Sequence, residues 1–222
     1  MYKNKIIPLT VESKKGEETF LKKISNKFKY GLVLQAIRNQ LARVGIVITP
    51  FYWVQEGMNF TKAPDIKGAI TDYKVEFLEA EDLKNISDNI HGYSAALLLS
   101  DLEEGNLCLG LKHNNDIASF MWIYLKECSY MSVNISLKND EAYLTSMYTI
   151  ESFRGNNLAP YLRYKSYEIL KKMGRDKIYS VSEFFNSSAI RYKQKLNAKN
   201  LKLVFYIQIF KRLKWSLTLK TY

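Results

Sequence analysis

Residues 143–173 constrain the fold of this chain more than any other stretch. They read YLTSMYTIESFRGNNLAPYLRYKSYEILKKM. The residues up to Ile150 have the apolar pattern of a mostly buried strand, and beyond a polar turn Leu158, Leu162 and Ile169 recur at helical spacing. A strand that leads through a short turn into an amphipathic helix predicts a sheet covered by helices.

The turn between this strand and helix has the features of an anion site. The first N–H groups of a helix lack partners within the helix, and the macrodipole favours negative charge there, so a phosphate or pyrophosphate is the expected ligand. Gly155 lets the backbone approach such a ligand closely, and Asn156 and Asn157 tolerate left-handed conformations. Ala159 keeps the first helical turn slim. The predicted site comprises Arg154, Gly155, Asn156, Asn157, Leu158 and Ala159.

At this turn the sequence resembles the GNAT superfamily of acyl-CoA-dependent N-acyltransferases. The signature with which that family holds phosphates is Arg or Gln, two residues, Gly, one residue, then Gly or Ala. Arg154, Asn157 and Ala159 stand at its three defined positions, with Asn157 where the family usually has Gly. A second family motif, Asn-x-x-Ala-Ile, is present in the expected order at residues 186–190. The resemblance covers about residues 71–210.

The resemblance implies a fold of the α/β (α+β) class, with a mixed, mostly antiparallel sheet flanked by helices. It also implies acetyl-CoA, or another acyl-CoA, as the co-substrate, and no metal. In similar enzymes the central strand contacts the pantetheine arm, which here would place Tyr148 and Thr149 beside it. Arg154 to Ala159 would surround the pyrophosphate, and Asn186 would contact the cofactor arm.

Acyl transfer to an amine also needs groups that move protons. Members of the family commonly have Tyr four residues after the Ala of the second motif, and that position here is Lys193. Tyr192 is one residue earlier, which rotates it by about 100° on a helix. Either Tyr192 acts as the acid from an altered register, another group does so, or water returns the proton. Glu183 is the first candidate for the base, with Tyr143 and Glu141 behind it, and an exposed loop carboxylate is the alternative interpretation of Glu183.

Alternating and apolar patterns predict the remaining elements of the sheet and its helices. Strands are expected at 73–78, 107–111, 117–125, 142–150, 178–182 and 201–210, and helices at 79–99 with a break near Gly92, after residue 158, and from about Asn186.

Two parts of the chain are expected, a helical and aromatic extension at residues 1–70 and a GNAT-like domain at 71–222. Residues 57–71 contain the Gly, Pro, Asn and Asp of a linker. Within the extension, Phe20–Val44 has a basic amphipathic pattern, which we expect to dock on its own domain, although such a helix also suits an anionic membrane surface. The apolar run 45–54 suits a strand, a docking segment or part of an acceptor pocket.

The charge of the chain favours anionic ligands. Its formal charge is +11 over 222 residues, which suits CoA phosphates, nucleic acid or an acidic membrane face. There is no apolar run of transmembrane length and no secretory signal pattern, so a cytoplasmic protein, at most peripheral to a membrane, is expected. Cys108 and Cys128 are expected to be reduced core thiols, and the two histidines lack metal-ligand spacing.

The leading hypothesis is therefore a cytoplasmic N-acetyltransferase in which an amine attacks the thioester directly. Its acceptor would be a small-molecule amine or an amino sugar, with an amino acid or a protein N-terminus as further alternatives, and the extension would shape the acceptor side or a homodimer contact. On this hypothesis nucleic acid is not an expected partner. The alternatives are a catalytically silent basic protein on the same fold, which binds RNA or an anionic membrane surface, and a protein for which CoA is only a structural or regulatory ligand.

Overall fold

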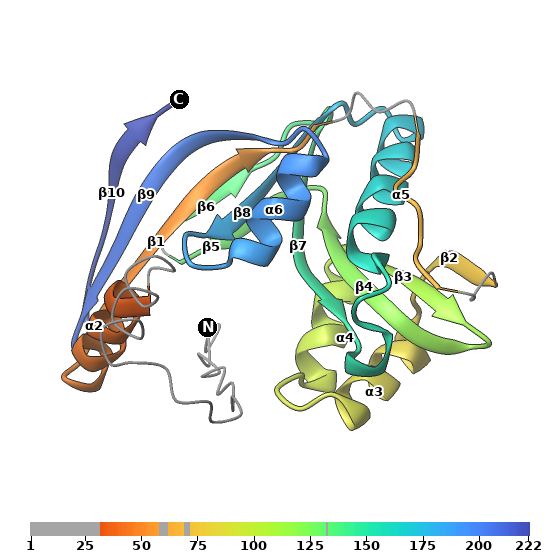
Figure 1. Ribbon diagram of the computed structural model, residues 1–222, viewed down its shortest axis with the longest axis horizontal. Coiled ribbons are helices and arrows are strands. Elements are labelled where there is room, and N and C mark those ends of the chain that lie inside the picture. The colour runs from red at the N-terminus through yellow and green to blue at the C-terminus, as the bar shows by residue number, and fades with distance from the viewer. Residues whose placement is uncertain (1–31, 58–61, 69–71, 132) are drawn as a thin grey trace, which may run out of the picture.

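A computed structural model describes residues 32–57, 62–68, 72–131 and 133–222 of the chain. Its centre is an eight-stranded sheet with the strand order β10-β9-β1-β8-β7-β4-β3-β2 (Figure 1). Neighbouring strands of this sheet are antiparallel except for β7 and β8, which are parallel. The fold is thus of the mixed, mostly antiparallel kind that the sequence predicts.

The strands are β1 (Ile46–Gln55), β2 (Tyr73–Phe77), β3 (Leu107–His113), β4 (Asp116–Tyr124), β5 (Glu127–Tyr130), β6 (Val133–Ser136), β7 (Glu141–Thr149), β8 (Lys177–Glu183), β9 (Lys199–Ile209) and β10 (Leu213–Thr221). The helices are α2 (Leu32–Arg43), α3 (Ala80–Asn89), α4 (Ala95–Glu103), the short 3₁₀ helix η1 (Glu151–Phe153), α5 (Leu158–Lys172) and α6 (Ser187–Lys195). Every strand and helix predicted between residues 73 and 210 is confirmed in type and approximate position.

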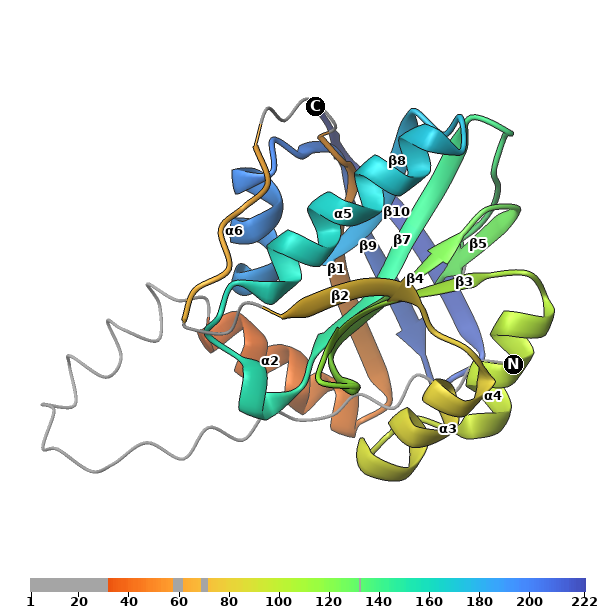
Figure 2. The ribbon, with the colours of Figure 1, turned by 90° about the vertical axis from the view of Figure 1, so that its right-hand side faces the viewer.

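Helices cover both faces of the β2-β3-β4-β7 half of the sheet (Figure 2). On one face, Leu162 and Leu170 of α5 pack with Met121 and Ile123 in one buried cluster. On the other face, side chains of α3 and α4 pack with Phe120 and Trp122. Because β4 is buried on both faces, its sequence is a continuous apolar run rather than an alternating one.

The run at residues 46–55 is placed differently from the expected separate extension. It forms β1, which lies between β8 and β9 in the sheet and pairs with both. Both edges of β1 are therefore paired with strands more than 120 residues away in sequence, a distance at which local patterns carry no information. Of the predicted helix Phe20–Val44, the structure describes α2 (Leu32–Arg43), and the earlier part lies outside the described residues.

Two features of the sheet were not predicted. The hairpin of β5 and β6 forms a small second sheet, and Tyr130 and Met131 from it pack on Phe51 and Tyr206 of the main sheet. The last strand, β10, pairs with β9 along its length, but all of its residues are exposed.

The cysteines agree with the sequence prediction, since Cys108 and Cys128 are both buried and free. In the described part of the chain, no helix is long and apolar enough to cross a membrane.

Candidate functional site

The parallel strands β7 and β8 pair over only part of their length. Their register runs from Glu141 opposite Lys177 to Leu144 opposite Ser180. Beyond these pairs, β8 pairs with β1 on its other side and β7 pairs with β4 on its other side. We call the two unpaired stretches, residues 145–149 of β7 and 181–183 of β8, the β7–β8 fork.

A bulge in β7 marks the start of the fork. Opposite β4, the register shifts between Phe120, which faces Tyr148, and Trp122, which faces Thr145. Two residues of β7 thus oppose one residue of β4, and the first of them, Ser146, has a positive φ of 51°. An extra residue in one strand of a pair bends that strand and increases its twist, which accounts for the departure of β7 from β8.

Backbone directions show which residues of β7 face the fork. The carbonyl of Tyr148 accepts a hydrogen bond from Ser119 Oγ at 2.7 Å, and the N–H of Ile150 donates to Ala118 O at 3.0 Å, so both face β4. Because backbone groups alternate along a strand, those of Met147 and Thr149 face the fork. Of the two residues predicted beside the pantetheine arm, Thr149 has its backbone on the fork side, whereas Tyr148 does not. Met147 was not predicted.

The turn from β7 into α5 has the expected backbone conformation. Gly155 has φ +88°, and a Cβ built there would meet no atom within 4 Å. Asn157 has φ +63° and is the residue before the first helical residue, Leu158. Among the described residues, the N–H groups of residues 155–159 have no hydrogen-bond acceptor, and Pro160 has no N–H. Five adjacent donors thus stand free at the positive end of a 15-residue helix.

The side chain of Arg154 lies against the end of β7. Its Nε donates to the carbonyl of Thr149 at 3.2 Å, and its guanidinium carbon is 5.7 Å from the centre of the Tyr148 ring. Its NH1 is 3.6 Å from a carboxylate oxygen of Glu151, and both of these side chains are more than half exposed. The guanidinium is held in place but remains accessible to a ligand.

Two predicted cofactor residues have structural partners instead of free side chains. Asn157 Nδ2 donates to the carbonyl of Asp65 at 2.7 Å and so ties residues 62–68 to the turn, as does the bond from Lys67 N to Asn156 O at 3.0 Å. Asn186 begins α6, where its Oδ1 accepts from the N–H of Ala189 at 3.0 Å. The oxygen of Asn186 is thus engaged as a helix cap.

The candidate acid and base contact different parts of the protein. Tyr192 is partly buried against the cluster under α5, and burial raises the pKa of its hydroxyl. Glu183 is exposed at the end of β8 and accepts a hydrogen bond of 3.4 Å from the hydroxyl of Tyr130, on the β5–β6 hairpin. Tyr130 packs on the cluster of Phe51 and Tyr206, so the structure does not bring Tyr192 and Glu183 into contact.

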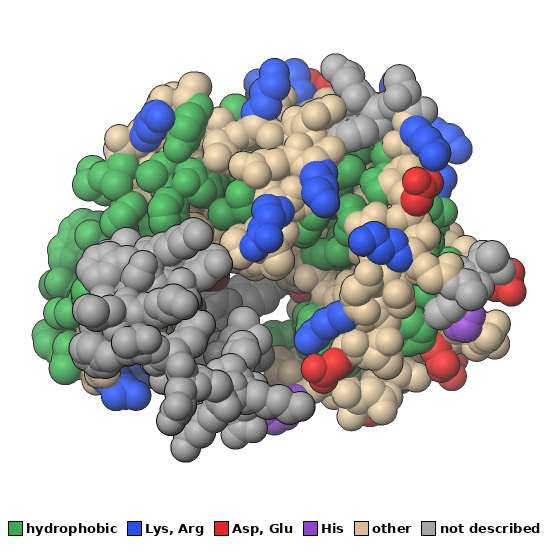
Figure 3. Space-filling model, in the orientation of Figure 1, with side chains coloured by type: hydrophobic (Ala, Val, Ile, Leu, Met, Phe, Trp, Pro, Cys, Tyr) green, Lys and Arg blue, Asp and Glu red, His purple; other side chains and the backbone are tan. Residues whose placement is uncertain are grey.

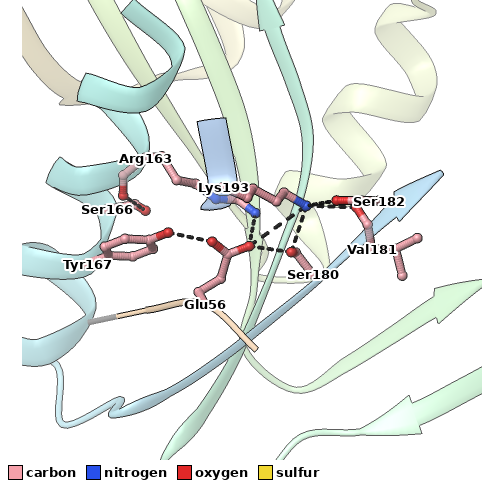
Figure 4. Close-up of polar contacts among 8 residues, drawn as sticks. All are labelled: Glu56, Arg163, Ser166, Tyr167, Ser180, Val181, Ser182 and Lys193. Carbon is pink, nitrogen blue, oxygen red and sulfur yellow. Dashed lines mark hydrogen bonds and ion pairs between the residues drawn. The ribbon is translucent and has the colours of Figure 1, made fainter. Parts of the chain in front are cut away.

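A buried cluster of charged side chains lies beside the fork and was not predicted (Figure 4). Glu56, directly after β1, has one oxygen 2.5 Å from Arg163 NH2 of α5 and 3.9 Å from Lys193 Nζ of α6. It also accepts hydrogen bonds from the hydroxyls of Tyr167 and Ser180. At most 5% of each of the three charged side chains is exposed. We call Glu56, Arg163, Tyr167, Ser180 and Lys193 the buried charge cluster.

The charges of this cluster shift one another's pKa values. Burial alone would raise the pKa of Glu56, but the charges of Arg163 and Lys193 outweigh it and lower that pKa to about 2. For Lys193, burial and the charge of Arg163 together outweigh the opposing effect of Glu56, and the pKa falls to about 7. Two sequence signals pointed here: Arg163 adjoins the apolar stripe of α5, and Lys193 occupies the position of the family's Tyr.

Comparisons with solved structures identify this architecture as a GNAT fold. A tandem GNAT protein from the clavulanic acid biosynthesis pathway aligns with a TM-score of 0.53 and 11% identity, over 82% of this chain and 58% of that one. A GNAT-family acetyltransferase from Colwellia psychrerythraea aligns with a TM-score of 0.52 and 14% identity, over 74% of this chain and 57% of that one. The chain thus spans somewhat more than half the length of these relatives.

A Drosophila protein aligns with a TM-score of 0.54 and 13% identity, over 82% of this chain and 59% of that one. No family model matches the sequence, and no curated protein matches it. The predicted resemblance to GNAT proteins is confirmed at the level of the fold.

Proposed function

We propose that this protein is an acyl-CoA-dependent N-acyltransferase that moves an acetyl group to a small-molecule amine or amino sugar. The observation that carries the proposal is the junction of the β7–β8 fork with the turn at residues 154–159. Backbone groups along an edge of β7 that no strand pairs with lead to five free N–H groups at the start of α5. An extended chain that ends in a pyrophosphate fits this sequence of donors, and acetyl-CoA is such a molecule.

On this proposal the chain's own groups bind and orient the co-substrate, which supplies an activated acyl carbon. The N–H groups of residues 155–159 and the guanidinium of Arg154 bind the pyrophosphate. The fork-facing backbone groups of Met147 and the N–H of Thr149 pair with the pantetheine arm as a strand would. Glu183, at the end of β8, is the candidate base for the acceptor amine. Little covalent chemistry by the protein is needed, because orientation of the amine against the thioester supplies much of the rate.

Calorimetric titration of the protein with acetyl-CoA tests the proposal. Wild-type protein should bind with micromolar affinity, and Arg154→Glu should weaken binding at least about tenfold because it places a negative charge beside the pyrophosphate. Lys172→Glu is the matched control, since it makes the same charge change at the exposed far end of α5 and should bind as wild type does. Absence of binding at millimolar acetyl-CoA in folded wild-type protein would refute the proposal, as would equal affinities of the two variants.

An acceptor screen follows if acetyl-CoA binds. Release of the free CoA thiol is measured with a panel of polyamines, amino sugars and amino acids. Turnover that depends on both acetyl-CoA and one of these amines would establish the activity. Binding without turnover for any amine would favour the hypothesis that CoA is only a structural or regulatory ligand.

A second candidate function, binding to an anionic membrane surface, is favoured by the β9–β10 hairpin. Residues 199–222 contain six Lys or Arg and no Asp or Glu. Phe210, Trp215 and Leu217 are 69%, 49% and 57% exposed, and hydrophobic side chains gather over this edge of the sheet at the left of Figure 3. Exposed apolar side chains among cations are the composition that anionic bilayers bind.

Sedimentation with lipid vesicles tests this second candidate. The protein should sediment with vesicles that contain phosphatidylserine and remain in solution with pure phosphatidylcholine. The double variant Trp215→Ser and Leu217→Ser should lose most of the binding. Equal sedimentation of the double variant and the wild type would exclude the hairpin as the membrane contact.

A further inference from the structure

The ammonium group of Lys193 lies at the point where β7 leaves β8. Its Nζ donates to Ser180 Oγ at 2.8 Å, to the carbonyl of Val181 at 2.8 Å and to Ser182 Oγ at 2.9 Å. Ser180 belongs to the last β7–β8 pair, and Val181 and Ser182 are the first residues of β8 beyond it.

The carbonyl that Lys193 binds faces the fork. On β8, the carbonyl of Ile178 accepts from Glu56 N at 2.8 Å and the N–H of Phe184 donates to Pro50 O at 3.0 Å, so even-numbered residues face β1. By alternation the backbone of Val181 faces β7. Continued pairing would give its carbonyl an N–H from β7, which the bulge at Ser146 removes. Lys193 supplies the missing donor, and its ammonium therefore stands inside the fork.

Lys193 also carries the excess charge of the buried charge cluster. The cluster holds two cations, Arg163 and Lys193, against one carboxylate. Glu56 is 2.5 Å from Arg163 but 3.9 Å from Lys193, so its charge compensates mainly the guanidinium. The other titratable side chains that interact with this cluster, Tyr143, Tyr167 and Tyr192, are uncharged because burial raises their pKa values. Loss of one proton from Lys193 would leave a neutral Glu56–Arg163 pair.

We propose that Lys193 is the acid that protonates the leaving thiolate of CoA, an assignment that rests on the proposed function. In the reaction, a bond forms between the amine nitrogen and the acyl carbon, and the carbon–sulfur bond breaks with its electron pair on sulfur. Because all three N–H groups of Lys193 Nζ donate to Ser180 Oγ, Val181 O and Ser182 Oγ, one of them must turn from its acceptor to the sulfur. The sulfur takes that proton, and the neutral amine of Lys193 regains a proton from water. The proton of the acylated nitrogen leaves to Glu183 or solvent. Lys193 thus takes the role for which the sequence offered Tyr192.

The electrostatics of the site agree with this role. A general acid works best when its pKa is near the working pH, and burial together with Arg163 brings the pKa of Lys193 to about 7. The rise in the pKa of Tyr192 on burial makes its hydroxyl a weaker acid. An ammonium beside the sulfur stabilises the thiolate as it forms, and proton transfer then leaves both groups neutral in a buried site, which avoids the cost of burying charges.

Titration of CoA bound to the protein tests the assignment without an acceptor. The ultraviolet absorbance of the thiolate is followed against pH in wild-type protein, in Lys193→Met and in Lys195→Met, which makes the same change at an exposed position of α6. In wild type and Lys195→Met the ammonium and the thiol should titrate as a coupled pair, so part of the thiolate should appear at lower pH than for free CoA, together with the first proton lost from the pair. In Lys193→Met it should appear about 1 to 3 pH units higher than in wild type, because an opposite charge nearby shifts a pKa by that amount.

Each outcome decides the assignment. A thiolate that appears in wild type at the pH of free CoA would overturn it, even if Lys193→Met does not fold. An equally early thiolate in wild type and in folded Lys193→Met would overturn it while leaving the proposed function intact. If calorimetry shows that wild type does not bind CoA, the proposed function fails and the assignment fails with it.

The pH dependence of turnover gives a second test. Substitution of a lysine that had only a structural role would not shift this pH dependence. With any amine found in the screen, wild-type kcat should fall as pH rises through about 7, as Lys193 loses its proton. Lys193→Tyr should shift this fall to higher pH, because the pKa of Tyr is higher. An unshifted fall in Lys193→Tyr would contradict the assignment.

Discussion

The turn at residues 154–159 and the buried charge cluster both lie along the β7–β8 fork, and each pairs an arginine with a glutamate. Arg154 and Glu151 are 3.6 Å apart, with 52% and 89% of their side chains exposed. Arg163 and Glu56 are 2.5 Å apart, with 1% and 0% exposed. The exposed guanidinium remains available to a ligand, whereas the buried one is paired with Glu56 and adds to the effect of burial in lowering the pKa of its neighbour Lys193.

Solvent explains the difference between the two pairs. Water and salt screen exposed charges, and exposed pairs contribute about 0 to 1 kcal/mol to stability. Burial removes that screening, so loss of one partner leaves an uncompensated charge. The exposed turn should therefore tolerate changes that alter ligand binding, and the buried cluster should respond to small changes with large losses of stability.

The largest effect is expected for Glu56→Gln. The substitution keeps the shape of the side chain but leaves the charges of Arg163 and Lys193 without a carboxylate. The free energy of unfolding in urea should fall by about 3 to 5 kcal/mol. Glu151→Gln makes the same change at the exposed pair and should alter the free energy of unfolding by about 0.5 kcal/mol or less. Similar losses for both variants would contradict the comparison between the two regions.

A smaller effect, which changes with pH, is expected for Lys193→Met. The folded pKa of Lys193, about 7, lies below the ordinary value of 10.5. Between these values the unfolded wild type binds more protons than the folded protein, so its stability should rise with pH, by at most about 1.4 kcal/mol per unit. Lys193→Met lacks this dependence. Urea unfolding at pH 6, 7.5 and 9 should therefore show that the free energy of unfolding of wild type rises with pH relative to that of Lys193→Met. A difference between the two proteins that does not change with pH would exclude a titrating Lys193.

The smallest effect is expected in the turn, where the backbone and not charge decides stability. Asn157 has φ +63°, and its side chain donates to the carbonyl of Asp65. Asn157→Ala should lower the free energy of unfolding by about 2 kcal/mol, because it loses the hydrogen bond and places alanine in a strained left-handed conformation. Asn157→Gly loses only the hydrogen bond and should cost about 1 kcal/mol or less. If thermal unfolding shows that Asn157→Gly is less stable than Asn157→Ala, this explanation of the turn is wrong.

The exposed turn was predictable from sequence because its determinants are local. Gly155 and Asn157 allow positive φ, and a helix begins directly after them. The cap formed by Asn186 and Ala189 spans only three residues. What the sequence did not reveal at the turn was the tertiary partner of Asn157, the carbonyl of Asp65, which lies 92 residues away.

The buried charge cluster was not predictable in the same way. Its members Glu56, Arg163 and Lys193 come from three distant segments, and their separations carry no periodicity. Arg163 is marked in the sequence only as a charge next to the apolar stripe of a helix, and Lys193 only as a lysine where similar proteins have tyrosine. Glu56 is not marked at all. Only the packing of β1, α5 and α6 turns these residues into one electrostatic unit.

The sequence by itself determined the strand, turn and helix at residues 143–173, the GNAT resemblance, and the order of the elements from 73 to 210 except for the β5–β6 hairpin. Hydrophobic period, turn residues and helix caps act over a few residues, so they can be recognised without the fold. The tertiary structure alone decided that β1 enters the sheet between β8 and β9, and that Lys193 replaces a missing strand partner inside the fork. Those outcomes depend on pairing and burial between distant segments. The protonation state of a buried side chain is decided only when the fold has excluded water around it, because charges interact more strongly there.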